Sequence, residues 1–481
     1  MRKHTPIIYK LQLTKSHLAS STMTHPLNVA VIGAGICGLL ATRELLREKQ
    51  QVTVFEKSDK VGGTWVYDPR VEAEDLLGLD PNRSIVHSSL YSSLRTNLPR
   101  PLMSFSDFSF EDKFYGDPRM FPGHEEVQKF LEHFAKEFGV SEVIRFNSEW
   151  TIEAGLKDEV FDAVVVCNGH HTEPRVADDI PGIKEWSRKQ VHSHNYRVPE
   201  PYHDQVVVVI GNGPSARDIS KDIAKVAREV HLSSRSSDVK VSKVDGYENM
   251  WQHLKITRVF DNGTVVFQDG HSIEADTILH CTGYKYHFPF LRTNDLVHVD
   301  NNRVDPLYKH VFPPQLAPRL AFVGLTFSTS SLDLFVQLPF ILEIKDYIYV
   351  DIPLMILCCS HYHCEDQRLI FPILELQSKW AALVISGKIL LPSEHEMLAE
   401  VHEHYRELDE NGFPKSLTHS LWHKLDYIDW LSDQVGLRVN VRVREIGTNL
   451  YEKWTSRANG LRDATVHDFL KAVLSQYQQS S

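Results

Sequence analysis

The stretch VAVIGAGICGLLATREL, Val29–Leu45, sets out a buried strand, a glycine-rich turn and the start of a helix. Its turn has the spacing Gly-x-Gly-x-x-Gly, at Gly33, Gly35 and Gly38. The first glycine permits the tight turn, the second lets the backbone approach a pyrophosphate, and the third lets the helix pack closely on the sheet. The helix N-terminus then offers free N–H groups to phosphates. The stretch predicts a dinucleotide-binding βαβ unit, and the alternative is a glycine-rich turn that holds no ligand.

An acidic residue and a second glycine pair follow this turn. Glu56 ends the next strand, Gln51–Glu56, at the position expected to hydrogen-bond a ribose hydroxyl. The segment KVGGTWVY, Lys60–Tyr67, resembles the second glycine signature of FAD enzymes, although Trp65 alone could be a packed aromatic. The predicted flavin-binding residues of this part are Gly33, Ala34, Gly35, Ile36, Cys37, Gly38, Glu56, Gly62, Gly63, Thr64 and Trp65.

A second turn of the same kind, in VVVVIGNGPSARDIS (Val206–Ser220), lies about 180 residues further on. Ala216 fills its third glycine position and adds one methyl group, which the motif tolerates. Where the first unit has Glu56, this one has Ser234 and Arg235, which would bind a 2′-phosphate that a carboxylate would repel. We therefore expect NADPH here, with a solvated surface arginine as the alternative for Arg235. The predicted NADPH-binding residues are Gly211, Asn212, Gly213, Pro214, Ser215, Ala216, Ser234 and Arg235.

Bulk properties exclude several classes of protein. The chain has 481 residues, a net charge of -11 and no strongly basic patch, so nucleic acid is not an expected partner. Its apolar runs are too short or too interrupted for a transmembrane segment. Six cysteines in so long a chain do not suggest a disulfide scaffold.

Residues 1–25 contain four basic residues and no acidic one, and they lack the apolar core of a secretory signal. We expect a disordered leader and a cytoplasmic protein, with a weak transit peptide as the alternative.

Short runs rich in Val and Ile, such as Phe161–Cys167 and Val206–Ile210, have helical segments between several of them. The expected helical segments include Gly38–Glu48, Glu125–Phe138 and Ser215–Ala227. This alternation predicts an α/β fold with parallel sheets covered by helices. Two dinucleotide sites in one chain indicate an electron relay, in which NADPH delivers a hydride to a flavin held by the other unit.

The electron acceptor is the next question. A disulfide reductase would need a cysteine pair facing the flavin, and Cys37 has no partner near it. The run CCSHYHC, Cys358–Cys364, has cysteine and histidine at metal-like density but lacks a second ligand pair, so we expect no metal site. Oxygen is the other common acceptor.

Several segments resemble flavin-containing monooxygenases. SSLYSSLRTNLPRPLMSFSDFSF (Ser88–Phe110) resembles their T-N-x-P segment, QVHSHNYR (Gln190–Arg197) resembles the end of their F-x-G-x-x-x-H-x-x-x-Y signature, and LHCTGYKYHFPFL (Leu279–Leu291) resembles their A-T-G-Y strand. FDAVVVCNGHHTEP (Phe161–Pro174) and ELQSKWAALVISG (Glu375–Gly387) are similar to the plant branch, in particular its glucosinolate S-oxygenase type.

The resemblance implies that NADPH reduces FAD, that reduced FAD captures O₂ as a C4a-hydroperoxide, and that a soft nucleophile takes one oxygen atom. The expected substrate is a small molecule with a thioether sulfur, such as a methylthioalkyl glucosinolate, or with an amine. Asn97 matches the family's asparagine near the flavin, with a turn cap before Pro99 as the alternative, and Gly324 is expected to reach the flavin. An NADPH oxidase and a catalytically impaired family member are the alternative functions, and a homo-oligomer is possible.

The resemblance also implies two Rossmann-like domains, with the NADPH domain inserted into a discontinuous FAD domain. The expected parts are the leader (1–25), the first FAD segment (26–198), the NADPH domain (199–276) and the second FAD segment (277–481).

Three departures stand out. Arg188 replaces a signature glycine whose backbone angles an arginine would not adopt easily. Where family members carry a longer β-meander, this chain has only Thr151–Lys157. The loss of those strands would expose a sheet edge. An insert at about 326–369 separates Gly324 from the helix that should point at the flavin. It resembles a translated retained intron or an error in gene prediction, and the alternative is a lid or interaction loop.

Overall fold

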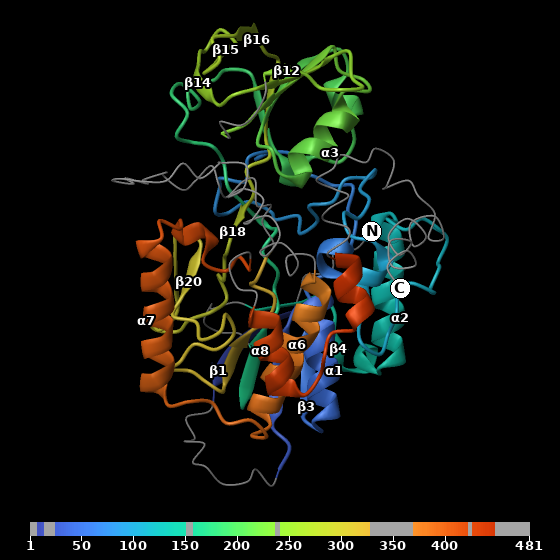
Figure 1. Cartoon of the computed structure of the whole chain (residues 1–481), viewed down its shortest axis with the longest axis vertical. Coiled ribbons are helices and arrows are strands. Elements are labelled where there is room, and N and C mark those ends of the chain that lie inside the picture. Colours follow the sequence, from blue (N-terminus) through green and yellow to red (C-terminus); the bar gives the residue numbers. More distant parts are fainter. Residues whose placement is uncertain are drawn as a thin grey trace, which may run out of the picture.

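The structure is a computed structural model, and Figure 1 shows a smaller upper unit that carries helix α3 above a larger unit with the other labelled helices. It describes residues 7–13, 25–150, 157–235, 241–327, 369–421 and 426–447. The α-helices are α1 (Ile36–Arg47), α2 (His124–Glu137), α3 (Pro214–Ile223), α6 (Ile370–Ile385), α7 (Glu394–Glu410) and α8 (Asp426–Val435).

The larger unit is built on a five-stranded sheet with the order β21-β7-β2-β3-β4, in which every neighbouring pair is parallel. The two central strands β2 and β7 are buried along almost their whole length, as a parallel sheet covered by other elements requires. The strands are β2 (Asn28–Ile32), β3 (Gln51–Phe55), β4 (Ile144–Arg145), β7 (Ala163–Val166) and β21 (Leu320–Phe322).

Helix α1, which follows β2, packs against α6, which comes from the other end of the chain (Figure 1). Arg43 of α1 is buried at this contact, and its Nη2 donates to Oε1 of Glu375 in α6 at 2.7 Å. Glu375 also accepts from the backbone N–H and the hydroxyl of Ser106. The two segments predicted to form the FAD unit are therefore joined through a satisfied buried ion pair.

The smaller unit has a six-stranded sheet with the order β12-β13-β11-β10-β17-β9, parallel except at the β12 edge. An antiparallel sheet of β14, β15 and β16 adjoins it in sequence. Its strands are β9 (Lys189–His192), β10 (Val206–Ile210), β11 (Glu229–Ser233), β12 (Ser242–Lys243), β13 (Met250–His253), β14 (Ile256–Val259), β15 (Thr264–Phe267), β16 (Ser272–Glu274) and β17 (Thr277–His280).

These two parallel sheets confirm the predicted α/β class with two Rossmann-like units. The second sheet, however, takes in β9 and β17, which lie just outside the predicted limits of 199 and 276. The reason is pairing: Thr277 is in register with Val207, and Lys189 is in register with Thr277.

Short elements complete the described part of the chain. They are β5 (Ser148–Trp150), β6 (Lys157–Phe161), β8 (Glu173–Pro174), β18 (Tyr284–Lys285), β19 (His298–Asp300), β20 (Arg303–Asp305), η1 (Gly63–Trp65), η2 (Arg100–Met103), η3 (Val140–Val143), η4 (Ser193–Asn195), η5 (Glu200–Tyr202) and η7 (Lys415–Leu417).

The leader contributes a strand where the sequence analysis expected disorder. Strand β1 (Ile7–Leu13) lies between β5 and β6 and pairs in parallel with both. The strands β5 and β6 flank the segment where the sequence lacks a longer β-meander, so β1 covers an edge that each of them would otherwise expose. The physical reason that this was missed is that β1 is defined by partners more than 130 residues away.

Among the described residues, no helix has the length and apolar character that crossing a bilayer demands. Most of the shortened meander segment (151–156), the Cys358–Cys364 run and residues 328–368 of the predicted insert lie outside the described residues.

We predict that Tyr9→Pro destabilises the protein while Tyr9→Ala does so much less. Tyr9 is in register with Trp150 of β5 and with Lys157 of β6, so its N–H faces a neighbouring strand on whichever side it points. Proline removes that donor, which should lower the free energy of unfolding by on the order of 1–3 kcal/mol. Thermal unfolding of both variants measures the effect, and equal midpoints for the two would contradict a paired β1.

Candidate functional site

At two of its three glycine positions, the first glycine turn has no room for any residue larger than glycine. Gly33 has φ +103°, and a Cβ there would lie 2.5 Å from the carbonyl oxygen of Cys167, just beyond β7. A Cβ on Gly38 would lie 1.9 Å from the carbonyl oxygen of Gly33. The turn is therefore held tight against the sheet, as a dinucleotide-binding turn requires.

The predicted second glycine pair lies directly on this turn. The N–H of Gly62 donates to the carbonyl oxygen of Ala34 at 3.0 Å. Gly63 has φ +56°, and a Cβ on it would lie 2.8 Å from Cα of Gly35. Thr64 and Trp65 continue from this pair in η1.

The first turn of α1 is open to an anion. Gly35 is its N-cap residue, no side chain caps the helix, and its first turn holds no acidic residue. With the glycine cradle beside it, this end of α1, where Ile36 and Cys37 lie, fits the pyrophosphate of FAD.

Glu56 follows β3 and braces the same turn. Its Oε2 accepts from the N–H of Ala34 at 2.7 Å, and its Oε1 accepts from the N–H of Ser58 at 2.8 Å. A carboxylate has about four acceptor sites, so the predicted contact with a ribose hydroxyl still has lone pairs to use.

Gly324, which is expected to reach the flavin, lies against the first turn of α1. It has φ +89°, and a Cβ on it would lie 2.3 Å from Sγ of Cys37 and 3.6 Å from Leu374 of α6. Burial raises the pKa of the Cys37 thiol to about 12, so this thiol stays protonated near neutral pH and is no nucleophile.

Helix α6 begins at Ile370, directly after the predicted insert, and no side chain caps it. Because Leu374 in its second turn lies against Gly324, the beginning of α6 is close to the first turn of α1. Gly324, which precedes the insert in sequence, and the beginning of α6, which follows it, therefore both lie beside the first turn of α1, where the flavin is expected.

The side chain of Asn97 is exposed and makes no hydrogen bond to the described residues. The neighbouring turn is braced by Thr96 instead, whose hydroxyl donates to the carbonyl oxygen of Leu98 at 2.8 Å. Leu98 packs on the same two hydrophobic clusters as Cys37. Asn97 therefore lies on the α1 side of the molecule with its amide available to a ligand.

The second glycine turn repeats the geometry of the first. Gly211 has φ +131°, and a Cβ on it would lie 2.4 Å from the carbonyl oxygen of Cys281, just beyond β17. A Cβ on Gly213 would meet no atom within 4 Å, which leaves the space that a pyrophosphate needs. Ala216 is a fully buried residue of α3, and the N-terminus of this helix, at Pro214 and Ser215, carries no side-chain cap. Asn212 accepts from Nε of Arg217 at 3.2 Å.

Arg235, which follows β11, interacts with a second arginine, Arg175, which follows β8. Arg235 is exposed, whereas Ser234 is buried and donates its N–H to the carbonyl oxygen of His253. The pKa of Arg175 is lowered by burial and then by the positive charge of Arg235, so the two guanidinium groups are close. A phosphate would relieve this repulsion. Sequence reasoning missed Arg175 because it belongs to no glycine motif and precedes β10 by some 30 residues.

The junction of the two units is fixed by residues of the family signature. The hydroxyl of Tyr196 donates to Oδ2 of Asp222 in α3 at 2.7 Å, and Ser93 donates to the same oxygen at 2.7 Å. His192 is fully buried, and its Nδ1 accepts from the N–H of His194.

Arg188 does not strain the backbone in the way the sequence suggested, because it is not among the described residues with positive φ. Its guanidinium donates to the carbonyl oxygens of Ala275 and Asn262 and pairs with Glu274. The room for this side chain comes from Gly263, where a Cβ would lie 2.2 Å from Cζ of Arg188. Arg188 is therefore accommodated without a strained backbone.

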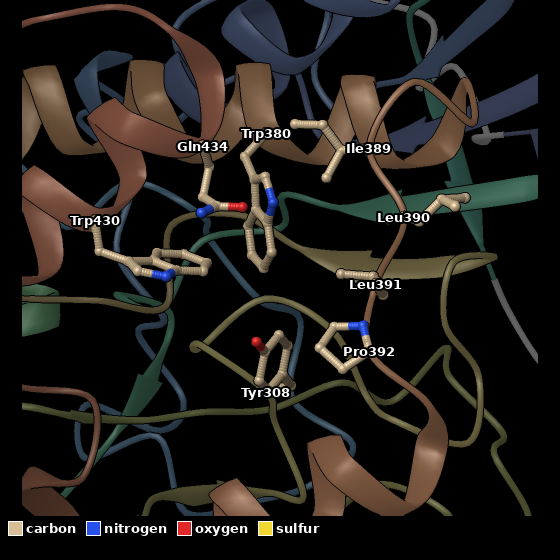
Figure 2. A pocket seen from close by; sticks show the side chains of 8 residues that line it. All are labelled: Tyr308, Trp380, Ile389, Leu390, Leu391, Pro392, Trp430 and Gln434. Atoms are coloured by element: carbon tan, nitrogen blue, oxygen red, sulfur yellow. The ribbon is translucent and has the colours of Figure 1, made fainter.

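A separate pocket of about 420 Å³ lies at the far end of α6. Figure 2 shows the rings of Trp380, Trp430 and Tyr308 around it. It contains none of the predicted cofactor-binding residues, so we do not assign the reaction to it.

Known proteins share the sequence pattern and the fold of this chain. The chain matches the family described as flavin-binding monooxygenase-like over residues 27–262, 253–337 and 364–446. It is 47% identical to flavin-containing monooxygenase FMO GS-OX5 of Arabidopsis thaliana, over 93% of this chain and 94% of that protein. The solved structure of S-allyl-L-cysteine S-oxygenase from Allium sativum is similar, with TM-score 0.80, 43% identity and coverage of 95% of this chain and 98% of that one. Tmm from Pelagibacter, at 22% identity and TM-score 0.66, shares the fold over 93% of this chain and 92% of that one.

We predict that Gly63→Ala weakens FAD binding and that Gly139→Ala does not. Both glycines have positive φ, +56° and +66°, so both variants carry a similar backbone penalty. Only at Gly63 does the new methyl meet the first glycine turn. Overpacking of about 1–3 kcal/mol corresponds to a loss of about 5- to 150-fold in FAD affinity. Flavin absorbance per purified chain reports it, and a Gly63→Ala protein that is as yellow as the Gly139→Ala control would refute the cradle.

Proposed function

We propose that this chain, which belongs to the flavin-binding monooxygenase-like family, oxygenates the sulfur of a small thioether. The protein is a flavin monooxygenase that depends on FAD and NADPH and uses O₂. The identity of the sulfide and the roles of individual residues are the proposed part.

One observation carries the assignment of the site. Glycines from three separate parts of the chain meet at the first turn of α1, namely Gly35, Gly63 and Gly324. A side chain on Gly63 or on Gly324 would collide with this turn, and Gly35 lies against Gly63, which has no side chain. Two segments distant in sequence, at Gly63 and Gly324, thus approach the N-terminal turn of α1 closely. The residues present thus fit a large ligand with a pyrophosphate at this turn.

The choice of a thioether rests on the relatives. The structurally similar protein of Allium sativum is an S-oxygenase of S-allyl-L-cysteine, and the match extends over nearly all of both chains. A methylthioalkyl glucosinolate-like sulfide is the substrate that the sequence resemblance favours, and an amine is the other soft nucleophile to be tested.

FAD held at the first glycine turn would supply the redox chemistry: with NADPH as the reductant, one oxygen atom of O₂ would go to the substrate and the other to water. The chain itself positions the reactants. Ser93 and Tyr196 fix α3 of the NADPH unit through Asp222, and this holds the two cofactor units in one relative orientation. Asn97 offers an exposed amide on the flavin side. No protein nucleophile is required, in agreement with the protonated thiol of Cys37.

Incorporation of ¹⁸O tests the proposed function. The purified protein is supplied with NADPH, ¹⁸O₂ and S-allyl-L-cysteine, a methylthioalkyl glucosinolate or a tertiary amine in parallel. We expect a sulfoxide that carries one ¹⁸O per NADPH consumed. NADPH consumption that yields only hydrogen peroxide would instead support the oxidase, and colourless protein without turnover would support an impaired family member.

The cytoplasmic location and a homo-oligomeric state stay predictions of the sequence. A fluorescent fusion expressed in plant cells tests the first, and light scattering of the purified protein tests the second.

We predict that Arg235→Ala and Arg175→Ala each raise KM for NADPH while leaving KM for NADH nearly unchanged. Each would remove a charge-assisted hydrogen bond to the 2′-phosphate, which costs about 1.5–3 kcal/mol or about 10- to 100-fold in KM. Arg228→Ala is the matched control, because Arg228 is an exposed arginine of the same unit that faces Asp276. Steady-state kinetics with both nucleotides measures the effect, and an equal change for NADPH and NADH would argue against 2′-phosphate recognition.

A further inference from the structure

Three side chains with metal-ligating atoms converge on the NADPH unit, away from the glycine turn. His253 ends β13, and Asp269 and His271 lie in the turn between β15 and β16. Nδ1 of His253 is 3.1 Å from Oδ2 of Asp269, and Nδ1 of His271 is 2.9 Å from Oδ1 of the same carboxylate. Ligand atoms of all three residues lie within 4.8 Å of one another.

The cluster continues inward as a chain of contacts. Nε2 of His253 is 3.1 Å from Nδ1 of His231, and Nε2 of His231 is 3.2 Å from Oε2 of Glu229. Two aromatic rings hold the two imidazoles in place, since Trp251 stacks on His231 with centroids 5.1 Å apart, and Phe267 stacks on His253 at 4.1 Å.

Proton counting shows that this chain is one proton short. Between the carboxylates of Glu229 and Asp269 there are three contacts, and each needs one N–H. Two neutral imidazoles carry only two N–H groups. One contact therefore joins two acceptors unless a further cation is present.

An additional proton is a poor way to remove the deficit. Both imidazoles are buried, and a charged group that leaves water loses its hydration there. A cation bound at the Asp269 end removes the deficit without an imidazolium. His253 then donates Nε2–H to His231, and His231 donates Nε2–H to Glu229.

We propose that His253 Nδ1, the carboxylate of Asp269 and His271 Nδ1 bind a divalent transition-metal ion such as Zn²⁺, with water completing the shell. Two imidazoles and one carboxylate are ligands that suit Zn²⁺, whereas Mg²⁺ and Ca²⁺ prefer oxygen alone. Bonds of about 2.0–2.2 Å in a tetrahedron place neighbouring ligand atoms roughly 3.3 Å apart. The two contacts of Asp269 with His253 and His271, at 3.1 and 2.9 Å, are close to this spacing. The contacts from His253 to His231 and Glu229 are the outer-shell support that metal-bound histidines usually have.

The ion would connect the β15–β16 turn to the end of β13. That strand end accepts the N–H of Ser234, beside the predicted 2′-phosphate site. The proposed site is thus structural and separate from the oxygenation reaction, and it goes beyond the proposed function of the enzyme.

The test is calorimetric titration of Zn²⁺ into the tag-free, chelator-treated full chain. We expect His271→Ala and Asp269→Asn to weaken one binding event by tenfold or more. The side chain of His271 is 63% exposed, so its replacement leaves the core intact. His298→Ala is the matched control, because His298 is also exposed and faces one carboxylate, that of Asp305, without a third ligand.

Unchanged Zn²⁺ affinity in both His271→Ala and Asp269→Asn would overturn the proposal. This holds also if the remaining binding takes place at the Cys358–Cys364 run. Equal weakening in His298→Ala, or binding of Mg²⁺ as tight as that of Zn²⁺, would overturn it as well. A Co²⁺ spectrum with visible bands that are lost in His271→Ala supports it. Flavin absorbance of the same samples is a separate readout, so failure of FAD binding cannot be mistaken for failure of the metal site.

Discussion

The contact between α1 and α6, with the buried pair of Arg43 and Glu375 at its centre, is the interaction on which the FAD unit depends. The two residues are 332 positions apart, and both side chains are at most 5% exposed. Arg43 also pairs with Glu44 and Asp107, so an ion-pair network joins α1 to α6. The first glycine turn leads directly into α1, so the packing of α6 on α1 also holds the predicted cofactor site in position.

This dependence explains how the chain accommodates its insert. The strand β21 ends before the insert and α6 begins after it, yet Gly324 and Leu374 still meet at the first turn of α1. The family match stops at residue 337 and resumes at 364, so the family-like parts on both sides converge in space. The insert separates the two parts along the sequence without separating the elements that form the site.

Local features of the sequence predicted the glycine turns correctly, because positive φ and close backbone approach at Gly33 and Gly211 depend on few neighbours. Features set by distant partners were missed or misjudged. Strand β1 forms only with its partners β5 and β6, and the side chain of Arg188 fits only because Gly263 leaves room for it. Arg175 becomes a candidate phosphate ligand only through its interaction with Arg235. The roles of Asn97 and of the nucleotide-contacting residues stay predictions.

The central claim is that the two separated segments form one FAD site despite the insert. The most direct measurement is the amount of flavin bound per chain in the full-length protein after purification, from its visible absorbance and protein content. The account predicts about one FAD for each folded chain. A protein that is folded by circular dichroism, yet binds no FAD even when it is supplied in excess, would contradict it.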